Sequence, residues 1–228
     1  MAERAPFPPR LRLNALLFLV SASSFGIVAA AVASGHRITL LDVELAHWLR
    51  DWATPQLTGW MLVVTHLHST TAVCVYGTVV AARMARWQRW RSLVTVAVCV
   101  GGGLALNVLV KHAFQRPRPM LDDPLLSLDT YSFPSGHVAG STLVYGLLVV
   151  LAFRRTRRPE ARGLAVAGAV AAIALVAFTR LYLGVHYLSD VIGGFFEGVA
   201  WLALCLGALE VLWRRDGERR GPQGPAPR

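Results

Sequence analysis

Lysine is almost absent from this sequence, and cysteine is scarce. Of the 23 basic residues only Lys111 is a lysine, and the others are arginines. The cysteines Cys74, Cys99 and Cys205 lie inside apolar runs, are odd in number and lack metal-ligand spacing, so neither a disulfide framework nor a cysteine metal site is expected. The arginines lie beside apolar runs rather than in one basic patch, which argues against nucleic acid as a partner despite a net charge of +10.

Long apolar runs, by contrast, fill most of the chain. Hydrophobic residues make up 54% of the sequence, charged residues only 16%, and the mean hydropathy is +0.47. Such runs are typical of transmembrane helices, which need about 20 apolar residues each. We therefore predict an all-α integral membrane bundle of six transmembrane helices, over residues 13–33, 57–82, 93–110, 138–153, 163–178 and 190–213. The six-span domain would cover residues 13–213, between a polar segment at 1–12 and a disordered tail at 214–228.

The first run and the arginines together predict how the chain crosses the membrane. The run ends in Ala31-Val-Ala33, which resembles a signal-peptidase site, but its apolar stretch is longer than a usual signal sequence and favours a retained span. Six spans place both termini on one side, together with 17 of the 23 basic residues. The positive-inside rule then predicts cytoplasmic termini in the cell membrane and extracytoplasmic first, third and fifth loops.

The connector after the first run has the spacing of an amphipathic helix. Four apolar residues recur there at helical intervals: Leu41, Leu45, Trp48 and Trp52. We predict a short helix in the membrane interface within the first outer loop. The acidic residues between the apolar ones, such as Asp42, are expected on its solvated face.

Two other groups of polar residues could suggest metal sites, and neither fits one. His66 and His68 are two residues apart in the second run, so they cannot share a helix face and are expected to be interior polar groups. Asp122, Asp123 and Asp129 follow no ligand motif and are expected in a solvated loop. No metal site is predicted.

Residues 179–190, between the last two runs, hold an unusual set of polar groups. His186 and Asp190 are four apart and would share one helix face, where the carboxylate fixes the imidazole tautomer and readies it for proton transfer or nucleophilic attack. Arg180 adds a permanent planar cation suited to phosphate. These residues alone are equally consistent with a polar helix junction at the membrane surface, with Asp190 as an N-cap.

The loop between the third and fourth runs adds groups that suit phosphate. Ser135, Gly136 and His137 immediately precede an apolar run, and a helix N-terminus there would offer free amides, a hydroxyl, close backbone approach and a titratable imidazole. Lys111 and Arg118 place further positive charge near the same membrane face. Snorkelling to the interface explains any one of these cations. It does not explain two histidines, a Ser-Gly pair and an aspartate at that face.

These residues form three spaced motifs that resemble the signatures of the type 2 phosphatidic acid phosphatases, also called lipid phosphate phosphatases. The motifs are Lys111 to Arg118-Pro119, Pro134 to His137, and Thr179-Arg180 through His186 to Asp190. Their spacings, their order and the six-span frame resemble that family over residues 36–213. Thr179 stands where the family usually has serine, and it keeps the hydroxyl. A second Arg-Pro pair begins at Arg116, but the family spacing favours Arg118 as the phosphate ligand.

The resemblance implies a membrane phosphatase that acts through a phosphohistidine. His186 would attack phosphorus, Asp190 would orient it, and His137 would protonate the leaving oxygen and then activate water. The groups implied to bind the phosphoryl oxygens are Lys111, Arg118, Ser135, the Gly136 amide and Arg180. Since fixed cations would supply the positive charge, neither a metal nor another cofactor is implied.

The implied partner is a lipid phosphate or pyrophosphate in the outer leaflet. Undecaprenyl pyrophosphate, in cell-wall lipid recycling, is favoured over phosphatidylglycerophosphate and phosphatidic acid, and protein partners are not indicated. Two alternatives remain: a lipid-to-alcohol phosphoryl transferase on the same fold, and a membrane protein that binds anionic lipid without turnover. The His–Asp pair and the lone Lys111 argue against the second, because binding alone needs no tuned histidine.

Overall fold

The computed structural model describes residues 8–35, 38–86, 89–122 and 124–219, and all regular secondary structure in these ranges is helical. The helices are α1 (Pro9–Ala33), α2 (Ile38–Asp51), α3 (Pro55–Leu67), α4 (Thr70–Arg86), α5 (Trp90–Val96), the π-helical η1 (Ala97–Gly101), α6 (Gly102–Phe114), α7 (Gly136–Arg155), α8 (Pro159–Tyr182) and α9 (Leu188–Arg219). The predicted all-α class is therefore confirmed for the described residues.

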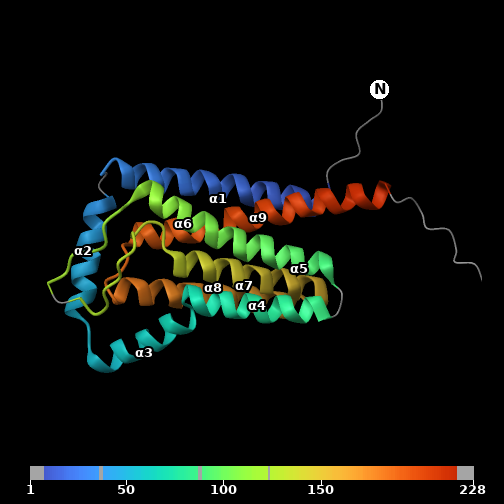
Figure 1. Cartoon of the computed structure of the whole chain (residues 1–228). Helices are drawn as coiled ribbons and strands as arrows, with labels where there is room; N and C mark the ends of the chain where they lie inside the picture. Colours follow the sequence, from blue (N-terminus) through green and yellow to red (C-terminus); the bar gives the residue numbers. More distant parts are fainter. Residues whose placement is uncertain (1–7, 36–37, 87–88, 123, 220–228) are drawn as a thin grey trace, which may run out of the picture.

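Most of the helices run side by side as one elongated bundle (Figure 1). Within the described residues, five helical segments are long and apolar enough to cross a membrane: α1, the joined α5–η1–α6, α7, α8 and α9. α4 runs along them, but its apolar stretch, Thr70–Val79, is shorter. α2 crosses one end of the bundle, near the link between α6 and α7, while the start of α1 and the end of α9 lie at the opposite end.

The second apolar run does not form the single helix expected over residues 57–82. α3 ends at Leu67 and α4 begins at Thr70, and His68 between them leaves helical geometry with φ −115° and ψ 16°. α3 lies at an angle to the bundle, whereas α4 runs along it (Figure 1). The sequence is polar at the break, where His68, Ser69, Thr70 and Thr71 follow Leu67. The prediction of one continuous span did not use this signal.

Two glycines let the third apolar run pack closely against its neighbours. A Cβ on Gly102 would lie 2.6 Å from the ring of Trp201, and one on Gly103 would lie 2.4 Å from Leu143. Only hydrogen fits at these positions without a shift of the Trp201 or Leu143 side chain. This close approach fixes α6, and with it Lys111 in its last turn, against the rest of the bundle.

The bundle exposes apolar side chains and buries charged ones. Leu16, Leu164 and other large apolar side chains are exposed along its outer faces. The buried side chains, in contrast, include Arg180, His186 and Asp190, each 2% exposed or less. Buried charge is costly within a membrane and usually marks a functional site. The end of the bundle that holds these residues is therefore the candidate functional site.

The end of the chain departs from the expectation in one respect. α9 continues to Arg219, six residues beyond the expected end of the last span at residue 213, so the tail begins as helix rather than as disordered chain. An unbroken apolar helix can extend past the bilayer without a stop signal, and the hydropathy pattern marks only where the apolar part ends. The expectations for residues 1–7, Asp123 and residues 220–228 lie outside the described residues.

Candidate active site

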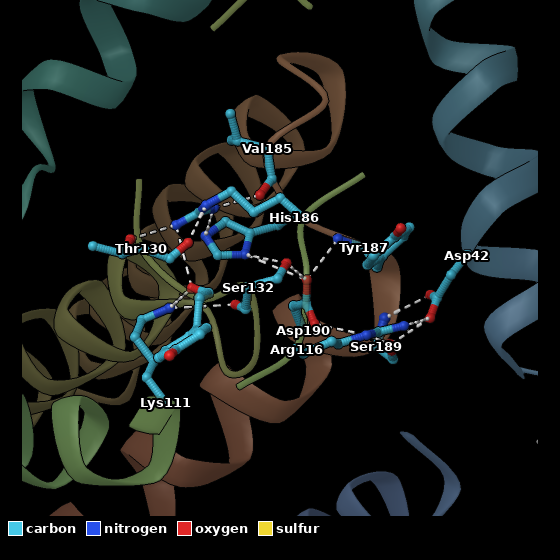
Figure 2. A network of polar contacts seen from close by, with 12 residues as sticks. Asp42, Lys111, Arg116, Thr130, Ser132, Val185, His186, Tyr187, Ser189 and Asp190 are labelled. Carbon is cyan, nitrogen blue, oxygen red and sulfur yellow. Dashed lines mark hydrogen bonds and ion pairs between the residues drawn. The ribbon is translucent and has the colours of Figure 1, made fainter. Parts of the chain in front are cut away.

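The three motifs meet at the end of the bundle that α2 crosses (Figure 1). Figure 2 shows Lys111, His186 and Asp190 of the first and third motifs. Lys111 is in the last turn of α6, Ser135 precedes α7, and Arg180 is in the last turn of α8. His186 lies in the short link between α8 and α9. Four helix ends, together with Arg118 in the loop between α6 and α7, thus bring the eight predicted site residues to one region.

His186 faces Asp190 from the turn before α9 rather than from the helix itself. The turn contains Gly184, whose φ of 68° favours glycine, and α9 begins after it. Nδ1 of His186 lies 3.4 Å from Oδ2 of Asp190, and both side chains are buried. Asp190 is inside the first turn of α9, not at its N-cap, and its Oδ2 accepts hydrogen bonds from the Tyr187 amide at 2.8 Å and from the Ser132 hydroxyl. The predicted pair therefore forms, across a helix start.

The surroundings of His186 keep its imidazole neutral. Burial lowers the pKa of His186 to about 3; Asp190 opposes this shift, and the positive charges of Arg180 and Lys111 add to it. Because Nδ1 faces a carboxylate, we assign the proton to Nδ1, which leaves the lone pair on Nε2. Nε2 lies 3.4 Å from Nη1 of Arg118. An unprotonated nitrogen beside a fixed cation can attack an anionic group that the cation binds.

Arg118 and Lys111 are oriented by backbone carbonyls. Nε of Arg118 donates to the Thr130 carbonyl at 2.7 Å, and Nη1 donates to the Val185 carbonyl at 2.5 Å. Nζ of Lys111 donates to the Tyr131 carbonyl at 2.7 Å. Neutral acceptors hold both cations in place without cancelling their charge, so that charge can act on a bound anion.

Arg180 is buried and only partly hydrogen-bonded. Its Nη1 donates to Oγ1 of Thr65 at 2.6 Å, while Nε and Nη2 have no partner among the described residues. The hydroxyl of Ser135 is also buried without a partner in that part of the chain. Unpaired buried donors cost free energy and are rare in folded proteins. These donors suit the oxygens of a phosphoryl group.

The start of α7 contributes the remaining predicted groups. Ser135 occupies the N-cap position, and Gly136 is the first residue of the helix. The amide of Ser135 donates to the carbonyl of Asp190 at 2.9 Å, which joins the start of α7 to the start of α9. His137 is half-buried in the first turn and interacts electrostatically with His186. The free amides and the dipole at this helix start favour an anion.

Gly194 lets α9 approach the start of α7, and we expect Gly194→Ala to lower both stability and activity. A Cβ there would lie 2.5 Å from the carbonyl oxygen of Ser135 and 3.2 Å from its amide nitrogen. Backbone atoms cannot rotate away as a side chain can, so the helices must shift, at a cost of about 1–3 kcal/mol. Thermal unfolding in detergent measures this loss.

The matched control for this prediction is Gly163→Ala on α8. Nothing lies within 4 Å of a Cβ on Gly163, and alanine favours a helix over glycine by up to about 1 kcal/mol. That variant should melt at or above the wild-type temperature. Equal melting temperatures for the two variants would contradict the prediction.

Arg116 and Asp42 join the site although the sequence did not predict it. Arg116 lies behind Asp190, donating from Nη1 to Oδ1 of Asp190 at 2.6 Å and from Nη2 to Oδ2 of Asp42 at 2.9 Å (Figure 2). The expectation that Asp42 lies on a solvated face is wrong, because it is only 1% exposed. The apolar residues Leu41 and Trp48 of α2 are exposed instead. The ion pair with Arg116, far along the chain, is what makes the inward position of Asp42 tolerable.

Two hydroxyl residues at the site were also not predicted. The Ser132 hydroxyl donates to Asp190. Ser132 is only three residues before Ser135, and this closeness in sequence could have indicated that it belongs to the site. Thr65 accepts from Arg180, but it lies in an apolar run and gave no signal. Both hydroxyls hold a charged side chain in place.

The remaining histidines and aspartates considered above have separate environments. His66 is exposed, so the expectation of an interior position is wrong for it, because α3 turns away from the bundle. His68 is half-buried, and its Nε2 lies 2.7 Å from the hydroxyl of Tyr145. Asp122 and Asp129 are exposed, which confirms the solvated position expected for them.

Comparisons with known proteins agree with the motifs. A family model described as the PAP2 superfamily matches residues 92–214, which include all three motifs. Phosphatidylglycerophosphatase B of Bacillus subtilis (strain 168) is 28% identical over 199 residues, covering 86% of this chain and 96% of that protein. The similarity therefore extends well beyond the motif segments.

Two solved structures resemble this fold. The crystal structure of the first transmembrane PAP2 type phosphatidylglycerolphosphate phosphatase from Bacillus subtilis matches with a TM-score of 0.74 and 27% identity, over 87% of this chain and 96% of that one. The crystal structure of Aquifex aeolicus LpxE matches with a TM-score of 0.56 and 22% identity, over 73% of this chain and 94% of that one. The second likeness bears on the fold alone.

Proposed function

The chain belongs to the PAP2 superfamily and is a multi-pass membrane phosphatase, and from this premise we propose that it removes phosphate from a lipid headgroup through a phosphohistidine on His186. The observation that supports the site most directly is the set of unpaired buried donors on Ser135 and Arg180. They accompany a neutral His186 on which Arg180 acts electrostatically. Donors for an anion and a nucleophile for its phosphorus thus occur together.

In the first step, Nε2 of His186 attacks phosphorus, and the bond from phosphorus to the lipid oxygen breaks. Asp190 faces Nδ1, keeps its proton in place and stabilises the positive charge that develops on the ring. His137 gives a proton to the departing oxygen, so the lipid alcohol leaves neutral. A bound phosphate dianion offsets the neighbouring cations and so favours the protonated form of His137 that this step needs.

In the second step, a water molecule attacks the phosphohistidine. His137, now neutral, accepts a proton from the water as its oxygen bonds to phosphorus. The bond between phosphorus and Nε2 of His186 breaks, and inorganic phosphate leaves. The cycle consumes one water and restores both histidines to their initial states.

Three cations stabilise the charge in transfer. Lys111, Arg118 and Arg180 bind the phosphoryl oxygens, together with the Ser135 hydroxyl and the Gly136 amide. Most phosphoryl-transfer enzymes place Mg²⁺ against these oxygens. Fixed cations supply the same charge here, so the proposed reaction needs neither a metal nor another cofactor.

The proposed topology is six crossings within a domain at residues 13–213, with α4 as the second crossing. α4 has 17 residues, about 25 Å of helix, which is slightly shorter than a typical hydrocarbon core and is accommodated by local thinning. The excess of arginine at the opposite end of the bundle supports an extracytoplasmic site and cytoplasmic termini. α2 lies in the interface, with Trp48 and Trp52 exposed.

Phosphatidylglycerophosphate is the substrate we favour, because both the curated relative and the crystal structure from Bacillus subtilis are named for it. The sequence alone favoured undecaprenyl pyrophosphate, and phosphatidic acid is the third candidate. All three present a terminal phosphate on a membrane lipid, so the residues that bind phosphate serve each of them. Contacts between the protein and the rest of the lipid must therefore determine which of the three is the substrate.

Phosphate release by detergent-purified protein tests the proposal. The three lipids are assayed in parallel in EDTA, and we expect release to persist and to be fastest from phosphatidylglycerophosphate. Activity that EDTA removes and Mg²⁺ restores would contradict the metal-free mechanism. A faster rate with undecaprenyl pyrophosphate would overturn the choice of substrate. Mass spectrometry of the products, with and without glycerol, separates hydrolysis from transfer to an alcohol.

A further inference from the structure

Asp42 is a buried carboxylate outside the three motifs and outside the residues that the family model matches. It lies on α2 and accepts hydrogen bonds from both the amide and the hydroxyl of Ser189, at the start of α9. Its Oδ2 also pairs with Nη2 of Arg116 at 2.9 Å. Burying a carboxylate is costly unless it is paired and hydrogen-bonded, and here both conditions are met. The partners of Asp42 therefore indicate its role, which is to hold Arg116 and the start of α9 in place.

Arg116 connects Asp42 to Asp190 (Figure 2). Its Nη1 lies 2.6 Å from Oδ1 of Asp190, and its guanidinium packs over the ring of Tyr187 at 4.3 Å. Burial alone would lower the pKa of Arg116, but Asp190 and Asp42 outweigh it and raise that pKa. One permanent cation thus lies between two carboxylates, of which the second faces His186.

The two oxygens of Asp190 serve different neighbours. Oδ1 accepts from Arg116, whereas Oδ2 accepts from the Tyr187 amide and faces Nδ1 of His186. The rotation of the carboxylate, and hence the position of Oδ2, depends on where Arg116 holds Oδ1. The direction of the Arg116 side chain depends in turn on Asp42.

We propose that Asp42 is a positioning residue of the phosphatase, which acts through Arg116 to keep Oδ2 of Asp190 on Nδ1 of His186. The inference rests on the roles proposed above for His186 and Asp190. Without Asp42, Arg116 would pair with Asp190 alone. The full positive charge of its guanidinium would then act on the Asp190 carboxylate. Asp190 would then stabilise the charged imidazole less as the phosphohistidine forms. Turnover would slow, while the groups that bind phosphate would stay in place.

This contact also makes α2 a part of the active site. Its outer face exposes Leu40, Leu41 and Trp48, while its inner face presents Asp42 to Arg116. A helix whose apolar face meets the surroundings of the protein therefore sets the geometry of the His–Asp pair. The family segment by itself lacks the second carboxylate of this arrangement.

Asp42→Asn and Arg116→Lys test the proposal. The first variant removes the charge with almost no change of shape, and the second keeps the charge but cannot bridge two carboxylates as a planar guanidinium does. We expect kcat to fall roughly 10- to 100-fold in each, as for other displaced catalytic groups, with KM within about two-fold of wild type. Asp42→Asn/Arg116→Gln should be about as slow as Arg116→Gln alone, because Asp42 acts through Arg116 and has no further effect once the guanidinium is removed.

Glu44→Gln is the matched control, since Glu44 is an exposed acid on the same helix. It should keep wild-type kcat and KM. Thermal unfolding in detergent shows whether each variant is folded, and Arg116→Lys, which keeps the buried charge balance, provides the test if Asp42→Asn does not fold. Unchanged kcat in the folded variant, or a rise in KM alone, would overturn the positioning role. An inactive wild-type protein would instead refute the proposed function.

Discussion

Replacing His186 with alanine is expected to lower phosphate release by at least about 10³-fold, the scale seen when a catalytic nucleophile is removed. The reason is that His186 provides a neutral nitrogen with a free lone pair beside the phosphate-binding cations. Burial holds the pKa of His186 near 3, so its lone pair is available at any physiological pH. Lys111, Arg118 and Arg180 are cations without a lone pair in that state. They can bind phosphate but cannot attack it.

The measurement is initial phosphate release from the best of the three lipids, at equal amounts of folded protein. His66→Ala is the control, because His66 is an exposed histidine whose Nδ1 contacts the Leu62 carbonyl of its own helix. It should leave the rate unchanged. His186→Ala should still bind phosphate, since the cations and the start of α7 remain. Wild-type release from His186→Ala would show that the nucleophile is another group.

A second readout separates loss of the nucleophile from loss of the fold. Rapid quenching of the wild-type protein with a phosphate-labelled lipid should trap label on the protein in a form that is stable to base and released by acid, as expected of a phosphorus–nitrogen bond. The label should be absent in His186→Ala. Label of the same stability in His186→Ala would assign the covalent bond to another residue.

The sequence could indicate that the motif residues lie near one another, because their geometry is mostly local. Lys111 ends one helix, Ser135 precedes another, and Arg180 ends a third, so each lies at a span end whatever the details of packing. Spans of similar length then bring alternate ends to the same membrane face. Once the six apolar runs are recognised, the convergence of these groups at one end follows from connectivity.

The contributions of α2 and α3 could not be predicted in the same way. Asp42 lies outside the apolar stripe of its helix, and Arg116, which is 74 residues further on, explains its burial. Thr65 reaches Arg180 because the chain breaks after Leu67. The polar residues His68 to Thr71 signal a break there, but they do not indicate that Arg180 is the partner of Thr65. A pattern in sequence reports which face of a helix is apolar. It does not report which distant partner makes a polar face the buried one.

Replacing His137 with alanine should affect substrates unequally, and this asymmetry tests its role as the proton donor. General acid catalysis contributes about 10²- to 10⁴-fold, so release from a lipid, whose alkoxide is a poor leaving group, should fall by that factor. A nitrophenolate leaves without needing a proton. With nitrophenyl phosphate, the variant should therefore still transfer the phosphoryl group to His186.

The second half of the reaction makes this prediction sharper. Hydrolysis of the phosphohistidine needs a base to take a proton from water, and His137→Ala lacks it. The variant should release one burst of nitrophenolate, equal to the amount of enzyme, and then turn over slowly while the phosphorylated protein accumulates. His137→Ala/His186→Ala is the control and should show no burst. Nitrophenyl phosphate that gives neither a burst nor turnover with His137→Ala would contradict the acid role, and fast steady turnover without accumulation would contradict the base role.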